Sequence, residues 1–205
     1  MSTLYLIRHG AIAADSAHHR FIGRLDIPLS SLGRQQMQKL STHPRLQAIG
    51  QVLASPLGRC RESADILTAA IGCGPARIVA DLAEIDLGLW EGLSKSEVET
   101  RFPGQYAARG ADLAGFRPEG GESFADLQQR CWPVLEQAAG CAIEHVALVT
   151  HAGVNRVLLC QILGMPLSRM FSLGQDYGCC NILHFRGKDA FVQGMNLCYH
   201  NLSFA

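Results

Sequence analysis

The sequence predicts an α/β fold in which helices cover both faces of a mostly parallel sheet. Short apolar runs at residues 3–7, 51–54 and 145–150 have the length and composition of buried strands, and helical segments lie between them. Strands that alternate with helices favour a parallel sheet. The 205 residues, 48% of them hydrophobic, suffice for one domain with its own core, so we expect a single domain over residues 1–205.

Helix signals occur between and after these strands. Ser30 or Ser31 can cap a helix that continues through residue 40, and Ser55-Pro56 begins a second helix with proline in its first turn. A kink is expected at Pro133, inside a long helix. The later helices are expected over residues 94–102, 122–139 and 154–163.

Three weaker segments complete the expected fold. Residues 77–80 are a short strand candidate, and residues 177–185 and 191–195 are expected to pair as edge strands. An edge strand at 177–185 could pair across a two-fold axis, so we expect a monomer or a homodimer. Residues 103–121, rich in Gly and Pro, are predicted to be a flexible lid within a lid-like insertion over about 94–121.

Charge and hydropathy exclude several classes of function. Eighteen basic and eighteen acidic residues cancel, so the chain lacks the broad basic surface that binding to nucleic acid requires. No apolar run approaches the ~20 residues of a membrane span. Residues 1–10 do not have the pattern of a secretory signal. We therefore expect a cytoplasmic protein with neither a nucleic acid nor a membrane partner.

The eight cysteines are interpreted as buried or incidental thiols. No two of them have the CxxC spacing of a zinc ribbon, and disulfides are rare in cytoplasmic proteins. The adjacent Cys179 and Cys180 are the pair of most interest. We predict no metal site from them.

Polar clusters follow three of the predicted strands at their carboxyl ends. Arg8 and His9 follow the first strand, residues 55–59 follow the second, and His151 follows the strand that ends at Thr150. In open α/β sheets, ligands bind beyond the carboxyl ends of the strands. Each of these residues alone has an ordinary structural explanation, but their shared position at strand ends predicts one common site.

The side chains at this site suit a compact dianion. Arg8 and Arg59 carry planar, permanently charged groups that match phosphate oxygens, and Ala152-Gly153 opens a helix whose free N–H groups favour an anion. An unprotonated His9 can attack phosphorus and form a covalent intermediate, with its other ring nitrogen held by a carbonyl such as that of Gly10.

The leaving alkoxide needs a proton, and a carboxylic acid beside the phosphate can supply it. Glu84 is our first choice for this acid, with Glu91 and Asp86 behind it. The arginines and His151 can neutralise the transferring group, so we expect no metal and no cofactor. The expected partner is a small-molecule phosphate ester.

Six blocks in order along the chain resemble the histidine phosphatase superfamily, whose members are phosphoglycerate mutase-like. The similarity spans about residues 3–185. The blocks are Leu6-Ile7-Arg8-His9-Gly10, Gly23-Arg24-Leu25-Asp26-Ile27-Pro28-Leu29 with Gly33, Ser55-Pro56-Leu57-Gly58-Arg59-Cys60 with Ser63-Ala64, Leu82 to Gly92 around Glu84 and Trp90-Glu91-Gly92, Pro118 with Gly121-Glu122-Ser123, and Val149-Thr150-His151-Ala152-Gly153.

The resemblance implies a three-layer α/β/α sandwich and a phosphohistidine at His9. It assigns Arg8, His9, Arg59 and His151 to the phosphate pocket and Glu84 to proton donation, which makes His9, Glu84 and His151 the catalytic set. The chain departs from the family after Arg-His-Gly, where Ala11, Ile12 and Asp15 replace the usual Glu, Thr and Asn. We do not assign a role to Asp15.

Within the superfamily, the sequence is closer to the phosphatase branch than to the mutases. The short length, the Trp90-Glu91-Gly92 block and the Gly-Arg-Leu-Asp segment are similar to the α-ribazole phosphatases of cobalamin biosynthesis. A phosphoglycerate mutase-type phosphotransferase and a non-catalytic phosphate-ligand binding protein stay open as alternatives. Substrate specificity is expected from the lid and from side chains around Arg24 and Trp90.

Overall fold

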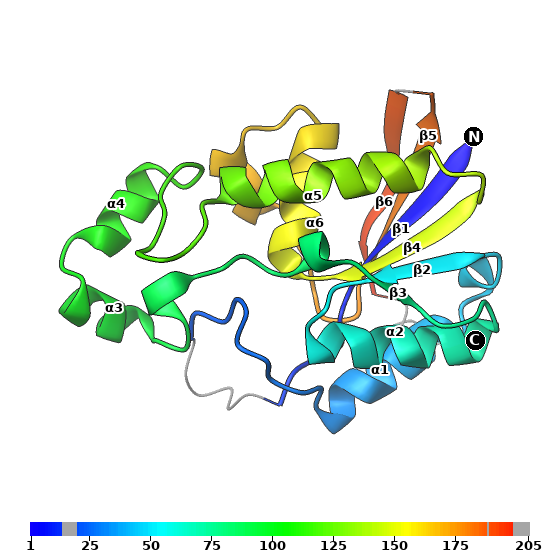
Figure 1. Ribbon diagram of the computed structural model, residues 1–205, viewed down its shortest axis with the longest axis horizontal. Helices are drawn as coiled ribbons and strands as arrows, with labels where there is room; N and C mark the ends of the chain where they lie inside the picture. The colour runs from blue at the N-terminus through cyan, green and yellow to red at the C-terminus, as the bar shows by residue number, and fades with distance from the viewer. Residues whose placement is uncertain (14–19, 188, 199–205) are drawn as a thin grey trace.

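A mixed sheet forms the centre of the molecule in the computed structural model, which describes residues 1–13, 20–187 and 189–198 (Figure 1). The strands lie in the order β3-β2-β4-β1-β5-β6. β3, β2, β4 and β1 are parallel, and β5 runs antiparallel to both β1 and β6. The strands are β1 (Ser2–Arg8), β2 (Gln51–Ala54), β3 (Arg77–Ile78), β4 (His145–Thr150), β5 (Cys180–Arg186) and β6 (Asp189–Leu197).

Helices cover both faces of this sheet (Figure 1). α1 (Ser31–Ser41) and α2 (Gly58–Ile71) lie on one face, and α5 (Phe124–Ala139) and α6 (Ala152–Ile162) lie on the other. α3 (Lys95–Arg101) and α4 (Gln105–Ala111) extend beyond one end of the sheet. Short 3₁₀ helices span Pro44–Leu46, Ala80–Leu82, Gly88–Trp90 and Leu167–Ser172. The predicted α/β/α sandwich is confirmed.

The two-residue period of β1 explains the three layers. Leu4 and Leu6 pack in the cluster beneath α5 and α6, whereas Tyr5 and Ile7 pack in the cluster beneath α1 and α2. Because both faces of the strand are covered, its sequence is a continuous apolar run rather than an alternating one. The same holds for β4, whose residues from Val146 onward are buried.

Helix starts follow the predicted caps at α1 but not at α2. The Ser30 hydroxyl accepts a hydrogen bond from the Gly33 amide at 3.0 Å, which makes Ser30 the N-cap of α1. α2 begins at Gly58, so the prediction that Pro56 lies in its first turn was wrong. The chain bends at residues 56 and 57, and the helix begins where Asp26 from a distant loop accepts a hydrogen bond from the Gly58 amide at 2.9 Å.

One further expectation needs correction. β5 and β6 pair with each other as predicted, but residues 177–185 do not form an edge strand, because β5 also pairs with β1 on its other side. The Gly- and Pro-rich segment 103–121 contains the helix α4, and its role as a lid stays a prediction. None of the helices in the described residues is long and apolar enough to cross a membrane.

Candidate active site

The carboxyl ends of three parallel strands bring the predicted residues to one cavity. Arg8 ends β1 and is followed by His9, Arg59 lies in the first turn of α2 after β2, and His151 follows β4. The cavity has a volume of about 210 Å³. It is lined by Arg8, His9, Ile12, Arg20, Ile22, Arg59, Glu84, Ala152 and Tyr177.

The His9 ring is held as a neutral imidazole with its lone pair on Nε2. Its Nδ1 lies 2.8 Å from the Gly10 carbonyl oxygen, an acceptor, so Nδ1 carries the hydrogen. Nε2 therefore bears a lone pair, and it accepts a 3.3 Å hydrogen bond from Nε of Arg59. Burial, together with the charges of Arg8 and Arg59, holds the pKa of His9 well below its usual value. The ring is thus in the nucleophilic state at neutral pH.

Backbone carbonyls fix both arginines beside His9. Arg59 donates to the carbonyl oxygens of Gly23 at 2.6 Å and Leu25 at 2.8 Å. Arg8 donates to the Gln175 carbonyl oxygen at 2.6 Å, and its guanidinium carbon lies 3.6 Å from the centre of the Tyr177 ring. Neither arginine pairs with a carboxylate among the described residues, so two positive charges border the cavity and favour an anion there.

His151 is fully buried next to His9. The two ring centres are 5.2 Å apart, and Nε2 of His151 lies 2.7 Å from the Ser55 hydroxyl oxygen. Burial first, and then the neighbouring His9 and arginines, hold the pKa of His151 well below its usual value. A neutral His151 and the hydroxyl of Ser55 therefore share a buried hydrogen bond behind the His9 ring.

Glu84 lines the cavity, and its carboxylate contacts the first turn of α6. One carboxylate oxygen accepts the amide of Ile85 at 2.9 Å, and the other accepts the amide of Gly153 at 3.0 Å. A Cβ at position 153 would lie 2.3 Å from Oε1 of Glu84, so only glycine permits this approach. The carboxyl group is thereby fixed at the cavity wall with 8% of the residue exposed.

The other two candidate acids have different partners. Glu91 accepts the amides of Gly23 at 3.1 Å, Arg24 at 2.6 Å and Leu25 at 3.3 Å, in the loop whose carbonyls hold Arg59. Asp86 pairs with Arg24 at 3.1 Å. Of the three candidate acids, Glu84 is therefore the one that borders the cavity. Glu91 holds in place the loop whose carbonyl groups bind Arg59.

Comparison with known proteins identifies the family. The profile described as the histidine phosphatase superfamily (branch 1) matches residues 4–197. The chain belongs to this superfamily. It is 27% identical to the adenosylcobalamin/α-ribazole phosphatase of Escherichia coli K12, over 94% of this chain and 95% of that protein. It is 32% identical to the glucosyl-3-phosphoglycerate phosphatase of Mycolicibacterium vanbaalenii, over 83% and 78%.

Solved structures of the superfamily agree with this assignment. The α-ribazole phosphatase from Shigella flexneri superimposes with a TM-score of 0.85 at 27% identity, over 95% of this chain and 96% of that one. These relatives support a phosphoric monoester hydrolase, as the sequence predicted. At this level of identity they do not define the substrate.

Within this histidine phosphatase, four of the predicted site residues, Arg8, His9, Arg59 and Glu84, line the cavity, whereas His151 is buried behind His9 and the predicted specificity residues lie elsewhere. Trp90 is fully buried against Phe21 and Phe116, and Arg24 pairs with Asp86 and Glu122; neither lines the cavity. Asp15 lies outside the described residues. No group of three or more His, Cys, Asp or Glu side chains in the described part of the chain could hold a metal ion.

Sequence reasoning missed Tyr177 as a pocket residue. Its ring stacks on the Arg8 guanidinium, lies 5.6 Å from the His9 ring and lines the cavity. It precedes β5, whose place beside β1 was not predicted, so no local signal indicated the contact.

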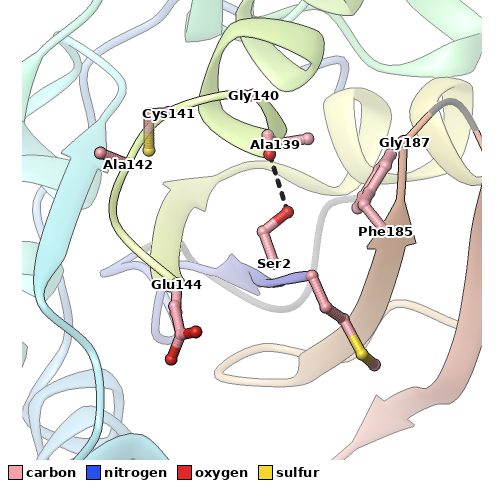
Figure 2. Close-up of a pocket in the computed structure, with 9 residues that line it drawn as sticks. Ser2, Ala139, Gly140, Cys141, Ala142, Glu144, Phe185 and Gly187 are labelled. Carbon is pink, nitrogen blue, oxygen red and sulfur yellow. Dashed lines mark hydrogen bonds between the residues drawn. The ribbon is translucent and has the colours of Figure 1, made fainter.

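A second cavity, of about 340 Å³, lies at the opposite edge of the sheet (Figure 2). Ser2 at the start of β1 donates a 2.7 Å hydrogen bond to the Ala139 carbonyl oxygen there, and Glu144 and Phe185 line other sides. No histidine, lysine or arginine is among the described residues that line it. Although larger, it has no group suited to phosphate chemistry.

Proposed function

We propose that this protein is a metal-independent phosphomonoesterase that hydrolyses a small phosphorylated metabolite through a phosphohistidine at His9. The observation that carries the proposal is the Nε2 lone pair of His9, since His9 lines the same small cavity as Arg8, Arg59 and Glu84. A nucleophile, two cations and an acid around one small cavity are the parts that phosphoryl transfer needs.

In the first step, Nε2 of His9 attacks phosphorus, the N–P bond forms, and the bond from phosphorus to the ester oxygen breaks. A protonated Glu84 gives its proton to the departing alkoxide, which leaves as an alcohol. Arg8, Arg59 and His151 stabilise the charge that spreads over the other phosphoryl oxygens. The hydrogen bond from Nδ1 to Gly10 holds the ring in the attacking orientation.

In the second step, water attacks the phosphohistidine and the N–P bond breaks. The Glu84 carboxylate accepts the proton of the attacking water, which restores the acid for the next cycle. Inorganic phosphate leaves and Nε2 regains its lone pair. Each step thus uses Glu84 in the opposite role, and no other proton carrier is required.

α-Ribazole phosphate is our first candidate substrate, which would give the protein a role in cobalamin biosynthesis. The Escherichia coli relative named for this substrate matches over nearly the whole chain. The same pocket accepts any monoester by its phosphoryl group, so the substrate has to be found with a panel of phosphomonoesters that includes α-ribazole phosphate.

Purified protein should release phosphate from p-nitrophenyl phosphate in the presence of a chelator. His9→Ala should lower kcat by several orders of magnitude, because the covalent route is lost. Near-normal turnover in this variant would end the proposal.

The two alternative functions predict other results. Faster interconversion of phosphoglycerate isomers than phosphate release would favour a mutase, and tight ester binding without turnover would favour a binding protein.

A further inference from the structure

Four polar side chains are buried near the carboxyl ends of β1 and β4 and are hydrogen-bonded to one another. They are Thr150, Asn155, Gln175 and Asn181, each 3% exposed or less. The Thr150 hydroxyl donates to Asn155 at 2.6 Å, and the Asn155 amide donates to Gln175 at 3.0 Å. Buried polar groups destabilise a fold unless each is paired, and an apolar core would need no such bonds. The network therefore indicates a role beyond packing.

Gln175 is the centre of this network. Its amide oxygen accepts hydrogen bonds from Asn155 at 3.0 Å and from Asn181 at 2.9 Å. Its amide nitrogen donates to Asn181 at 2.8 Å and to the Gly174 carbonyl oxygen at 2.6 Å. Asn181 in turn donates to the Leu6 carbonyl oxygen in β1 at 3.0 Å. A side-chain amide has two acceptor and two donor positions, so all four positions of Gln175 are used.

The backbone of the same residue holds Arg8. The Gln175 carbonyl oxygen accepts the 2.6 Å hydrogen bond from Arg8, which is the one bond that the Arg8 side chain makes to the described residues. Nε of Arg8 is buried and has no acceptor among them. Two residues after Gln175, the Tyr177 ring stacks on the Arg8 guanidinium group. The loop of residues 174–178 therefore sets the position of Arg8.

The other arginine of the pocket is held by a different loop. Arg59 donates to the carbonyl oxygens of Gly23 and Leu25, and that loop is fixed by the carboxylate of Glu91. Neither carbonyl belongs to the buried network. The network is thus connected to one of the two cations and not to the other.

We propose that Gln175 is a positioning residue for phosphoryl transfer. Its buried side chain fixes the 174–178 loop, so that the Gln175 carbonyl oxygen and the Tyr177 ring hold Arg8 ready for the phosphoryl group. This inference rests on the proposed function, because it takes the phosphoryl group to lie against His9 and Arg8. A guanidinium group that is oriented before the substrate binds loses less entropy on binding, and its N–H groups already point to where the phosphoryl oxygens will lie.

Gln175→Met removes the hydrogen bonds of the side chain and keeps the backbone carbonyl. Methionine is unbranched and adapts to the space that glutamine fills. We expect the affinity for inorganic phosphate, measured by calorimetry, to fall about tenfold, because the contact of Arg8 with the anion is weakened. The kcat/KM for p-nitrophenyl phosphate should fall by at least the same factor.

Two double-mutant cycles separate positioning from general damage to the pocket. Arg8→Lys replaces the planar group by a point charge and should weaken phosphate binding about tenfold in the wild type, but only about twofold in Gln175→Met. Arg59→Lys is the matched control. It should weaken binding by the same factor with and without Gln175→Met, because Gly23 and Leu25 still hold Arg59. The inference is overturned if Arg8→Lys has the same effect in both backgrounds, or if both arginines are coupled equally to Gln175.

If Gln175→Met does not fold, Asn196→Gly tests the same loop from outside the core. The Asn196 side chain accepts the Asp176 amide at 2.7 Å and donates to the Asp176 carboxylate at 2.8 Å. Asn196 has a φ of 52°, which glycine adopts without strain. This variant should show the same coupling to Arg8→Lys, with a smaller factor, and no coupling to Arg59→Lys. Equal coupling to both arginines, or none to Arg8, would overturn the inference.

Failure of the proposed function would look different from failure of this inference. In that case the wild type would bind no phosphate, or its turnover would survive His9→Ala, and the role of Gln175 would fall with it. If only the inference fails, phosphate binding and the dependence on His9 are normal and the cycles alone show no selective coupling.

Discussion

Burial sets the charge of the two active-site histidines at the scale of single residues. His9 is 4% exposed and His151 is fully buried, and the neighbouring arginines add to the cost of a positive charge on either ring. Two neutral rings can therefore lie 5.2 Å apart beside two guanidinium groups. The burial that keeps His9 unprotonated also makes the stability of the folded protein depend on pH.

We predict that the protein loses stability as the pH falls below about 6.5, the ordinary pKa of histidine. The unfolded chain binds a proton at His9 in this range, whereas the folded protein, with a lowered pKa, does not. The free energy of unfolding should thus fall by up to about 1.4 kcal/mol per histidine between pH 7.5 and 5.5. Urea titrations of the wild type and His9→Gln measure this, and the variant should show the smaller decline. An identical decline in the wild type and in His9→Gln would contradict the lowered pKa of His9.

The contact between Gly153 and Glu84 allows a test of the acid. In Gly153→Ala, the new methyl group would overlap Oε1 of Glu84 and displace the carboxyl group. General acids contribute roughly 10²–10⁴-fold, so kcat for an alkyl phosphate should fall by about 10²-fold. Turnover of p-nitrophenyl phosphate should fall far less, because its leaving group needs little protonation. Gly140→Ala, whose new Cβ would meet its nearest neighbour at 3.4 Å, is the control.

Equal losses for the two esters would show that Gly153→Ala disturbs the pocket as a whole rather than the acid. The thermal midpoint of the variant separates this outcome from simple misfolding. Because α6 begins at Ala152 and carries several buried residues, a large fall in the midpoint would point to a repacked helix.

At the scale of elements, the sequence predicts what local interactions decide. Residues 51–54 and 145–150 were expected as strands and form β2 and β4 with those bounds, because each is an apolar run covered on both faces. The start of α1 is set by the hydroxyl of Ser30, three residues from the amide it caps. The same strands also allowed the pocket residues to be predicted, because each of these residues lies at or shortly after the end of a strand.

What the sequence does not predict depends on contacts between distant segments. The start of α2 is set by Asp26, 32 residues before Gly58. The place of β5 beside β1 follows from pairings such as Leu4 with Leu183, which no local pattern encodes. Tyr177 reaches Arg8 only because of that pairing. Trp90 has the aromatic character of a binding residue, yet its neighbours Phe21 and Phe116 enclose it.

At the scale of the whole molecule, the packing of the layers separates the eight cysteines into two groups. Cys60, Cys131, Cys160, Cys179 and Cys180 are buried between sheet and helices, whereas Cys73, Cys141 and Cys198 are partly exposed. All eight are free thiols. Burial raises the pKa of Cys131 and of Cys179 to about 12, so their reactive thiolate forms are scarce at neutral pH.

We therefore predict that a thiol reagent labels Cys73, Cys141 and Cys198 in the native protein and all eight cysteines only after unfolding in guanidinium chloride. Mass spectrometry of the labelled peptides identifies the sites. Cys60 is the decisive one, because it packs 3.4 Å from Nε2 of His151 beneath the pocket. If Cys60 reacts as fast as Cys73, the layers open readily around the active site, and the neutral state of His9 that depends on burial would not persist in solution.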